Sequence, residues 1–455
     1  MTSESSHTRN WLVMTAVGVG SLLGSIDGSI VNVALPTIGR DLKSEVATAE
    51  WVTTIYVLMA CGLLLTFGRI GDMRGYKPIY VLGLATFVAS SALCGLAPNI
   101  ATLILFRAVQ GVGGSMLISI GPGILTVTFP PSQRGKVLGL QALMIYVGGT
   151  LGPVLGGVLT DALSWRAIFY VNVPIGLVAL VLSAKYIPRA ALAKQSERFD
   201  LPGAALIMAM CSLLLIVLDQ GHAYGWTSPY IVTMFAADVL LLIAFLLIES
   251  RTRSPLLDLS LFRVPAFSLA GASAICNYIG FFESIFLMPF YLIQGRGLSS
   301  SSAGLIVAVQ SVLMALAAPV AGAISDRIGT RLPATVGMAV LAVSMYMLSF
   351  LGPASSLMYI GIAMGASGLG IGSFVPPNNS AMMGSAPKHR QGIAGGVVAT
   401  FRYTGMMLGY GLSGAIFTSF IRVHTQAAFY GGIRVSFLVA SAVSCMGCIA
   451  SAARK

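Results

Sequence analysis

Five ionisable residues interrupt otherwise apolar stretches of this 455-residue sequence: Asp27, Arg107, Asp238, Glu283 and Arg402. A charge inside hydrocarbon is costly, so residues of this kind usually handle ions, protons or ligands. Burial favours the protonated form of a carboxyl group and a nearby arginine favours the ionised form, so helix movement would switch its proton affinity. We predict that the five residues serve proton coupling, with a peripheral structural role as the alternative for Asp238.

The segment that begins at Arg107 places a cation beside an amide and small residues. Arg107, Gln110, Gly111 and Gly114 are spaced at i, i+3, i+4 and i+7, so they share one face of a helix. That face must look inward, toward a cavity or a partner. Counted from the outer helix ends, Asp27 lies ~14 Å deep and Arg107 ~10 Å deep. The two side chains could pair, although depth alone does not show that they do.

Glu283 lies in the middle of an aromatic-rich segment. An aromatic wall with one carboxylate suits a lipophilic cation, because the rings attract the cation while the carboxylate neutralises it. The alternative is that these rings face lipid or pack against other helices. The candidate substrate-binding residues are Asn32, Gln110, Tyr278, Phe281, Phe282, Glu283, Phe286 and Phe290.

The composition shows what kind of elements must position these residues. The chain is 56% hydrophobic and 9% charged, whereas an ordinary soluble domain carries roughly 25% charged residues. A transmembrane helix needs ~20 apolar residues, and such windows follow one another along nearly the whole sequence. They predict an all-α membrane protein with fourteen transmembrane helices. The expected spans are residues 11–36, 50–69, 78–97, 100–129, 135–160, 165–186, 201–220, 229–248, 266–294, 300–324, 332–352, 356–385, 391–418 and 427–451.

The distribution of charge predicts the orientation. Most of the 27 Lys and Arg residues fall in loops on the side of the N-terminus. Because basic loops stay in the cytoplasm, we expect both termini there, and the net charge of +12 requires no nucleic acid. The six cysteines lie in apolar stretches and the four histidines in tails or loops. We therefore expect no metal, no cofactor and no enzymatic activity.

The chain repeats itself. Residues 68–77 recur as residues 322–331, and residues 131–134 are echoed by residues 387–390. Two parallel halves of six helices, with two helices inserted between them, satisfy both repeats. The expected domains are a six-helix bundle at 1–190, the inserted pair at 191–262 and a second six-helix bundle at 263–455.

These motifs resemble the major facilitator superfamily, and in particular its fourteen-helix drug:proton antiporter branch of the multidrug efflux type. The first loop motif departs from the family pattern at Met73 and Tyr76, where arginine is usual. The residues that the resemblance assigns to a cytoplasmic gate are Gly68, Asp72, Arg74, Gly75, Lys77, Asp326 and Arg327. The residues that match the antiporter motif of the fifth helix are Gly148, Gly152, Pro153, Gly156 and Gly157. Plain helix packing is the alternative for this stripe.

The resemblance implies a proton-coupled antiporter of the cell inner membrane that exports small lipophilic, cationic compounds such as drugs and dyes by alternating access. The expected partners are the substrate, protons and the bilayer, and the expected state is a monomer. Asp27 is favoured as the principal coupling acid because it lies in the first-helix motif of the branch. Glu283 is then the substrate-facing acid, and the reverse assignment stays open.

Two other transport functions remain open. Arg107 and Arg402 could bind the negative charge of an organic anion that is imported. The substrate could instead be a lipid or an endogenous metabolite that is exported. A sensor on the same fold is a further alternative, because fold alone does not determine function.

Overall fold

The computed structural model describes residues 3–188, 200–252, 256–257, 259–385, 391–421 and 425–454. Within these ranges the chain is helical and contains no strand. Thirteen of the described helices are long and apolar enough to cross a membrane. A further helix, α14 (Gln391–Ile421), has 31 residues, which is also long enough. The prediction of an all-α membrane protein is confirmed. The predicted domain limit at residue 190 and the repeat at 387–390 lie outside the described residues.

The helices pack into two compact units. The first comprises Met1–Met208 with Thr252–Leu256, and the second comprises Ala209–Arg251 with Leu257–Lys455. The helices of the first unit are α1 (Ser3–Asp41), α2 (Val46–Arg74), α3 (Tyr76–Leu96), α4 (Ile100–Thr128), α5 (Pro131–Ala162), α6 (Ala167–Tyr170), α7 (Asn172–Tyr186) and the beginning of α8 (Leu201–Tyr224).

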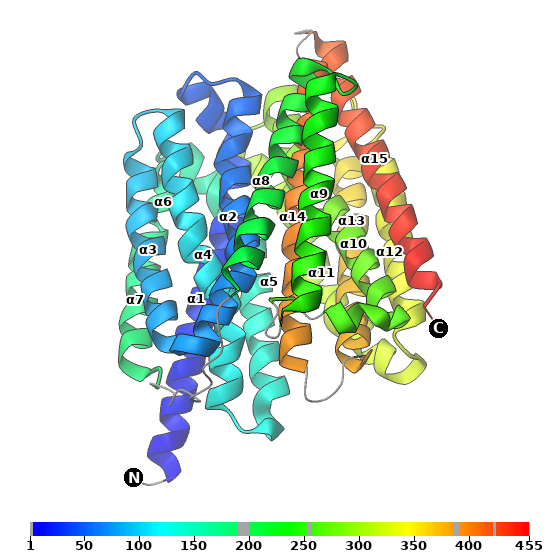
Figure 1. Cartoon of the computed structure of the whole chain (residues 1–455). Helices are drawn as coiled ribbons and strands as arrows, with labels where there is room; N and C mark the ends of the chain where they lie inside the picture. Colours follow the sequence, from blue (N-terminus) through cyan, green and yellow to red (C-terminus); the bar gives the residue numbers. More distant parts are fainter. Residues whose placement is uncertain are drawn as a thin grey trace. The chain divides into compact units, whose positions relative to one another are not determined.

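The second unit contains the rest of α8 and all later elements (Figure 1). These are α9 (Pro229–Arg251), a 3-10 turn η1 (Leu259–Arg263), α10 (Pro265–Pro289), a π-helical turn η2 (Phe290–Gly295), α11 (Ser300–Ile328), α12 (Arg331–Leu348), α13 (Leu357–Ser385), α14 and α15 (Gln426–Ala452).

The two units repeat the same packing pattern. In the first, α1 packs on α5 and α7, α4 on α2 and α3, and α3 on α7. In the second, α10 packs on α14 and α15, α13 on α11 and α12, and α12 on α15. The repeated loop motif also has one backbone form, since Gly75 and Gly329 end matching helices with φ of 91° and 87°. Glycine adopts this region without steric cost. The internal repeat predicted from the sequence is confirmed.

The span expected at residues 165–186 is broken at Val171, between α6 and α7. Pro174 explains the break, because its ring would clash with the carbonyl group of Tyr170, four residues earlier in a continuous helix. The interruption places Asn172 at the beginning of α7, where its side chain is fully buried.

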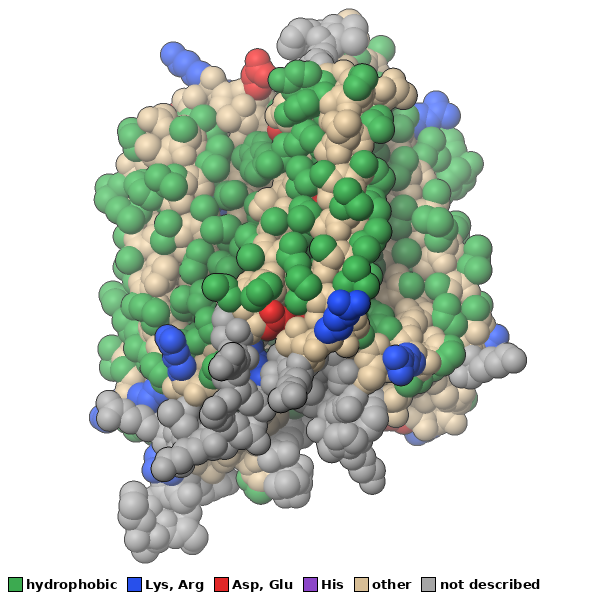
Figure 2. All heavy atoms as spheres, in the orientation of Figure 1, with side chains coloured by type: hydrophobic (Ala, Val, Ile, Leu, Met, Phe, Trp, Pro, Cys, Tyr) green, Lys and Arg blue, Asp and Glu red, His purple; other side chains and the backbone are tan. Residues whose placement is uncertain are grey.

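Helix α9 presents an apolar surface. Figure 2 shows hydrophobic side chains along the face that this helix offers, with Lys and Arg side chains near the lower end of the view. Such a surface suits contact with lipid. The exposed large hydrophobic residues of α9 are Tyr230, Val232, Phe235, Val239, Leu240, Leu242, Ile243, Leu246 and Leu247.

Candidate functional site

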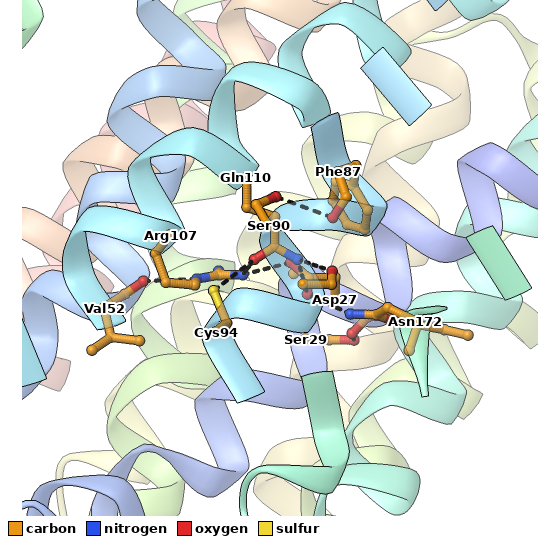
Figure 3. A network of polar contacts seen from close by, with 12 residues as sticks. Asp27, Ser29, Val52, Phe87, Ser90, Cys94, Arg107, Gln110 and Asn172 are labelled. Carbon is orange, nitrogen blue, oxygen red and sulfur yellow. Dashed lines mark hydrogen bonds and ion pairs between the residues drawn. The ribbon is translucent and has the colours of Figure 1, made fainter. Parts of the chain in front are cut away.

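The first unit contains a buried ion pair between α1 and α4. Arg107 Nη1 lies 2.7 Å from Asp27 Oδ2, and both residues are 0% exposed. Depth along the helices did not show whether Asp27 and Arg107 pair, and the structure shows that they do. Figure 3 shows the two side chains pointing toward each other within a larger polar network.

Further donors complete the surroundings of the Asp27 carboxylate. Gln110 Nε2 and Asn172 Nδ2 donate to its Oδ1 at 3.0 and 2.8 Å. Arg107 donates from Nε to the Val52 carbonyl at 3.0 Å and from Nη1 to Gln110 Oε1 at 2.6 Å. Both carboxylate oxygens thus accept hydrogen bonds, and the buried charges balance each other. A buried pair is tolerated when its remaining hydrogen-bonding groups are satisfied in this way.

Small residues on α4 let its neighbours come close enough to form this network. A Cβ atom on Gly111 would lie 2.7 Å from the Tyr56 carbonyl oxygen of α2. One on Gly113 would lie 2.8 Å from the Phe87 nitrogen of α3. The approach of α2 also places the ring of Tyr56 4.3 Å from the Arg107 guanidinium carbon. The segment of α4 that begins at Arg107 therefore both supplies the charge and makes room for the helices around it.

The network includes residues that the sequence did not single out as site residues. Asn172 lies far from Asp27 in the sequence, and nothing in its local pattern indicates their contact. Ser91 on α3 accepts a hydrogen bond from Gln110 at 2.6 Å. The signal that could have indicated Asn172 is Pro174, which ends the preceding helix beside it.

Among the described residues of the second unit, no such ion pair lies at the matching place. Glycine contacts establish the match. A Cβ atom on Gly152 of α5 would contact the Ile26 carbonyl oxygen, and one on Gly409 of α14 would contact the Ile279 carbonyl oxygen in the same way. The next residues along the chain, Asp27 and Gly280, therefore correspond. A Cβ atom on Gly280 would lie 2.9 Å from Ser444 Oγ of α15, whereas Asp27 accepts a hydrogen bond from Asn172 of α7. The polar chemistry of the two units is different.

The buried acid of the second unit is Glu283 on α10. It is 0% exposed, and neither carboxylate oxygen has a hydrogen-bond partner among the described residues. The adjacent Ser284 accepts a hydrogen bond from Gln310 Nε2 at 2.8 Å, and the same nitrogen donates to Ser367 at 2.6 Å. Asp27 is thus saturated with donors, whereas Glu283 is isolated.

The predicted aromatic residues form a continuous row with rings of α14. Phe282 and Phe286 lie 5.6 and 5.8 Å from Tyr410, measured between ring centroids. Phe290 lies 5.8 Å from Phe417. At its other end the row includes Tyr278 and Phe281, which lie 6.4 and 4.8 Å from Phe282.

Three further predicted residues have the following contacts and burial. Asn32 donates at 2.9 Å to the Gly28 carbonyl of its own helix. Arg402 is half-buried, with its guanidinium carbon 5.0 Å from the Tyr403 ring. Asp238 is buried on α9 at 7% exposure. Their assignment to substrate binding or coupling remains a prediction.

The gate residues lie at the ends of matching helices. Asp72 is exposed and accepts a hydrogen bond from the Tyr76 hydroxyl at 2.7 Å. Tyr76 stands where the family pattern has arginine, so here a neutral donor binds the carboxylate. Asp326 and Arg327 are exposed at the end of α11.

The glycine stripe of α5 packs directly on α1. Cβ atoms on Gly148 and Gly156 would lie 2.7 Å from the carbonyl oxygens of Leu22 and Ile30, and one on Gly152 would collide with the Ser29 hydroxyl. This spacing leaves no room for a larger residue, as in other close helix contacts in membranes.

We expect Gly148→Ala to destabilise the protein by about 1–3 kcal/mol, because the added methyl overpacks a backbone contact. Gly139→Ala is the matched control: Gly139 is exposed on the same helix with no atom within 4 Å of its Cβ position. Its replacement should stabilise the helix by up to ~1 kcal/mol. Thermal unfolding in detergent measures both. Equal effects of the two changes would contradict the close contact between α1 and α5.

A multi-pass helical chain with a buried charge pair in one unit and an isolated acid in the other is typical of a membrane transporter. The model of the Major Facilitator Superfamily matches residues 17–410 and 270–453, so the chain belongs to this superfamily. It is a transporter of small molecules and not an enzyme.

Known proteins resemble it along most of their length. It is 34% identical over 415 residues to the riboflavin transporter RibZ of Clostridioides difficile, covering 90% of this chain and 88% of that one. It is 30% identical over 411 residues to the tetracenomycin C resistance and export protein of Streptomyces glaucescens, covering 90% and 76%. The crystal structure of a bacterial homolog of the lysosomal transporter Spinster has a TM-score of 0.69 at 16% identity, over 97% of each chain. This last likeness shows the fold alone.

Proposed function

We propose that this transporter is a proton-coupled antiporter that exports small lipophilic cations across the cytoplasmic membrane. The observation that carries the proposal is Glu283, a fully buried acid without a partner among the described residues, on the helix that also bears the aromatic row. An isolated carboxylate is very costly in such a place, so the acid is expected to hold a proton when no cation is near. Release of this proton when the cation binds would couple the two fluxes.

The geometry favours Glu283 as the proton-binding acid, which is the assignment that the sequence left as the second possibility. Asp27 already has a cation and two amide donors. We propose that the Asp27–Arg107 pair holds α1, α2, α3, α4 and α7 in register during alternating access. In this cycle the predicted gate residues would close the cytoplasmic side, and the two six-helix halves would alternate the access of the substrate site, as the family resemblance implies.

The direction of transport is supported by the glycine motif of α5 and by the relative named for resistance and export. Riboflavin transport is the second candidate, favoured by the relative named for that substrate. The bias of basic residues toward one side supports cytoplasmic termini. Labelling of a Lys43→Cys variant by an impermeant thiol reagent from outside intact cells tests this orientation.

The proposal is tested with purified protein in liposomes under an imposed pH gradient. A cationic dye, riboflavin and an organic anion are offered separately, with protein-free liposomes as the control. Accumulation of the dye against its gradient, with proton movement in the opposite direction, is the expected result. Transport of riboflavin or the anion alone would favour the corresponding alternative, and transport indifferent to pH would reject proton coupling.

We expect Asp72→Asn to slow transport by on the order of tenfold while leaving substrate affinity within about twofold, since a gate residue biases access states and does not touch substrate. Lys185→Gln serves as the control, because Lys185 is an exposed charge in the last turn of α7 and is not assigned to the gate. Transport rate and binding are compared at matched protein levels. Equal losses of binding and transport would count against a gate.

A further inference from the structure

One face of α10 carries a polar stripe through the interior of the second unit. Ser273, Asn277, Gly280 and Ser284 are spaced at i, i+4, i+7 and i+11, so they lie along one side of the helix. Ser273 donates to the Gly447 carbonyl of α15 at 3.1 Å. This side of α10 thus faces α15, and it does so with polar groups.

The middle of the stripe contains buried polar atoms without protein partners. Asn277 Oδ1, Ser444 Oγ and both oxygens of Glu283 accept or donate no hydrogen bond among the described residues. All three residues are 0% exposed. Buried polar atoms in native proteins are bonded to protein or to ordered water in the great majority of cases. A bound polar ligand between these side chains would satisfy them.

Two of the three residues flank Gly280 on α10, and the third approaches it from α15. Ser444 Oγ lies 2.9 Å from the place where Gly280 would carry a Cβ atom. Glu283 follows Gly280 by one helical turn, and helix side chains lean toward the N-terminus, so its carboxyl group inclines toward that glycine. Asn277 precedes Gly280 by one turn on the same side. Because glycine has no side chain, the Ser444 hydroxyl comes close to the α10 backbone between the acid and the amide.

We propose that the second unit holds a bound water lined by Asn277, Ser444 and Glu283, and that this water passes protons to and from the acid. This inference rests on the proposed role of Glu283 in coupling. The acid donates to the water, the amide oxygen accepts from it, and the hydroxyl can do either. These groups provide the two to four partners that a buried water needs.

The proposed water site and the aromatic row lie on different faces of α10. Phe282 lies two residues after Gly280, and thus about 200° around the helix. It packs on Tyr410 of α14, on the aromatic side proposed for the substrate. Glu283 lies between the two faces. Binding at the rings would then reach the proton site through movement of α10 and not through direct displacement.

No charged residue of the described neighbours forms an ion pair with Glu283. Arg402 on α14 follows Phe401, whose ring contacts Gly271, twelve residues before Glu283. The other charged groups on packed elements lie at exposed positions or near helix ends: Arg263, Arg296, Asp326, Arg327, Arg331 and Arg434. The titratable Tyr410 lies on the aromatic side, with its ring centroid 5.8 Å from that of Phe286. The water site therefore controls proton exchange without a competing charge.

Infrared spectroscopy of the purified protein tests the proposal without a transport assay. The carboxylic acid band that disappears in Glu283→Gln belongs to Glu283, and its rate of hydrogen-deuterium exchange is then measured in Ser444→Ala and Asn277→Leu. We expect both variants to slow exchange on the order of tenfold, the effect of one lost hydrogen bond. Ser436→Ala is the matched control, since Ser436 is a buried serine of α15 eight residues before Ser444.

The outcomes are distinct. Lack of a band assignable to Glu283 would reject its role as proton binder, and with it the proposed coupling. A band whose exchange is as fast in Ser444→Ala and Asn277→Leu as in Ser436→Ala overturns the water site alone. Melting temperatures within a few degrees of the parent confirm that the variants are folded, and either lining variant suffices if the other does not fold.

Discussion

Replacing Arg107 by leucine is expected to abolish transport and to lower the free energy of unfolding by about 3–5 kcal/mol. Asp27 and Arg107 are both fully buried, and their atoms lie 2.7 Å apart. Without the guanidinium group, the carboxylate of Asp27 remains buried with only two amide donors. The Val52 carbonyl and the Gln110 oxygen each lose one donor as well. The loss is large because the change leaves a buried carboxylate without its cation and removes further buried hydrogen bonds.

The double replacement Asp27→Leu with Arg107→Leu should recover most of the stability, since no uncompensated charge remains, but not the transport. The control is Arg166→Leu, because Arg166 and Asp41 form an ion pair whose side chains are 34% and 52% exposed. Exposed pairs contribute ~0–1 kcal/mol. Denaturant unfolding in detergent gives the values for the parent and the three variants. A double variant no more stable than Arg107→Leu would show that the charges do not compensate each other.

Glu283→Gln is expected to abolish accumulation driven by a pH gradient while leaving substrate exchange without a gradient largely intact. Glutamine has the size of the neutral acid and cannot carry the proton. Because Glu283 has no bonded cation among the described residues, we expect stability to change by less than about 1 kcal/mol, as is usual for volume-conserving replacements.

Asp27→Asn provides the comparison, because it leaves Arg107 as an uncompensated buried cation. We expect that variant to lose about 3 kcal/mol or more of stability. Uphill transport and exchange are measured in the same liposomes, at matched protein content. Full uphill transport by Glu283→Gln would remove this residue from coupling, and equal loss of exchange and uphill transport would indicate a defect in binding or folding.

The sequence by itself predicted the helical elements well, because a span is a local property. Apolar windows of sufficient length must be helical in lipid, where each backbone group needs a partner within its own segment. The loop glycines Gly75 and Gly329 adopt a positive φ, which glycine allows by its residue type alone. The spans, the internal repeat and the all-α fold follow from such features. The break before Asn172 needed closer attention to Pro174 but was also encoded locally.

The tertiary structure alone decided which acid is paired. Asp27 and Glu283 look alike in the sequence, since each is a carboxyl group within an apolar span. The partners of Asp27 come from α4 and α7, far along the chain, so the residue spacing within α1 cannot indicate them. At the corresponding place in the second unit stand Gly280 and Ser444, and Glu283 one turn away has no donor among the described residues. The difference between a satisfied and an isolated buried acid depends on contacts between helices, which hydropathy and spacing within one helix do not determine.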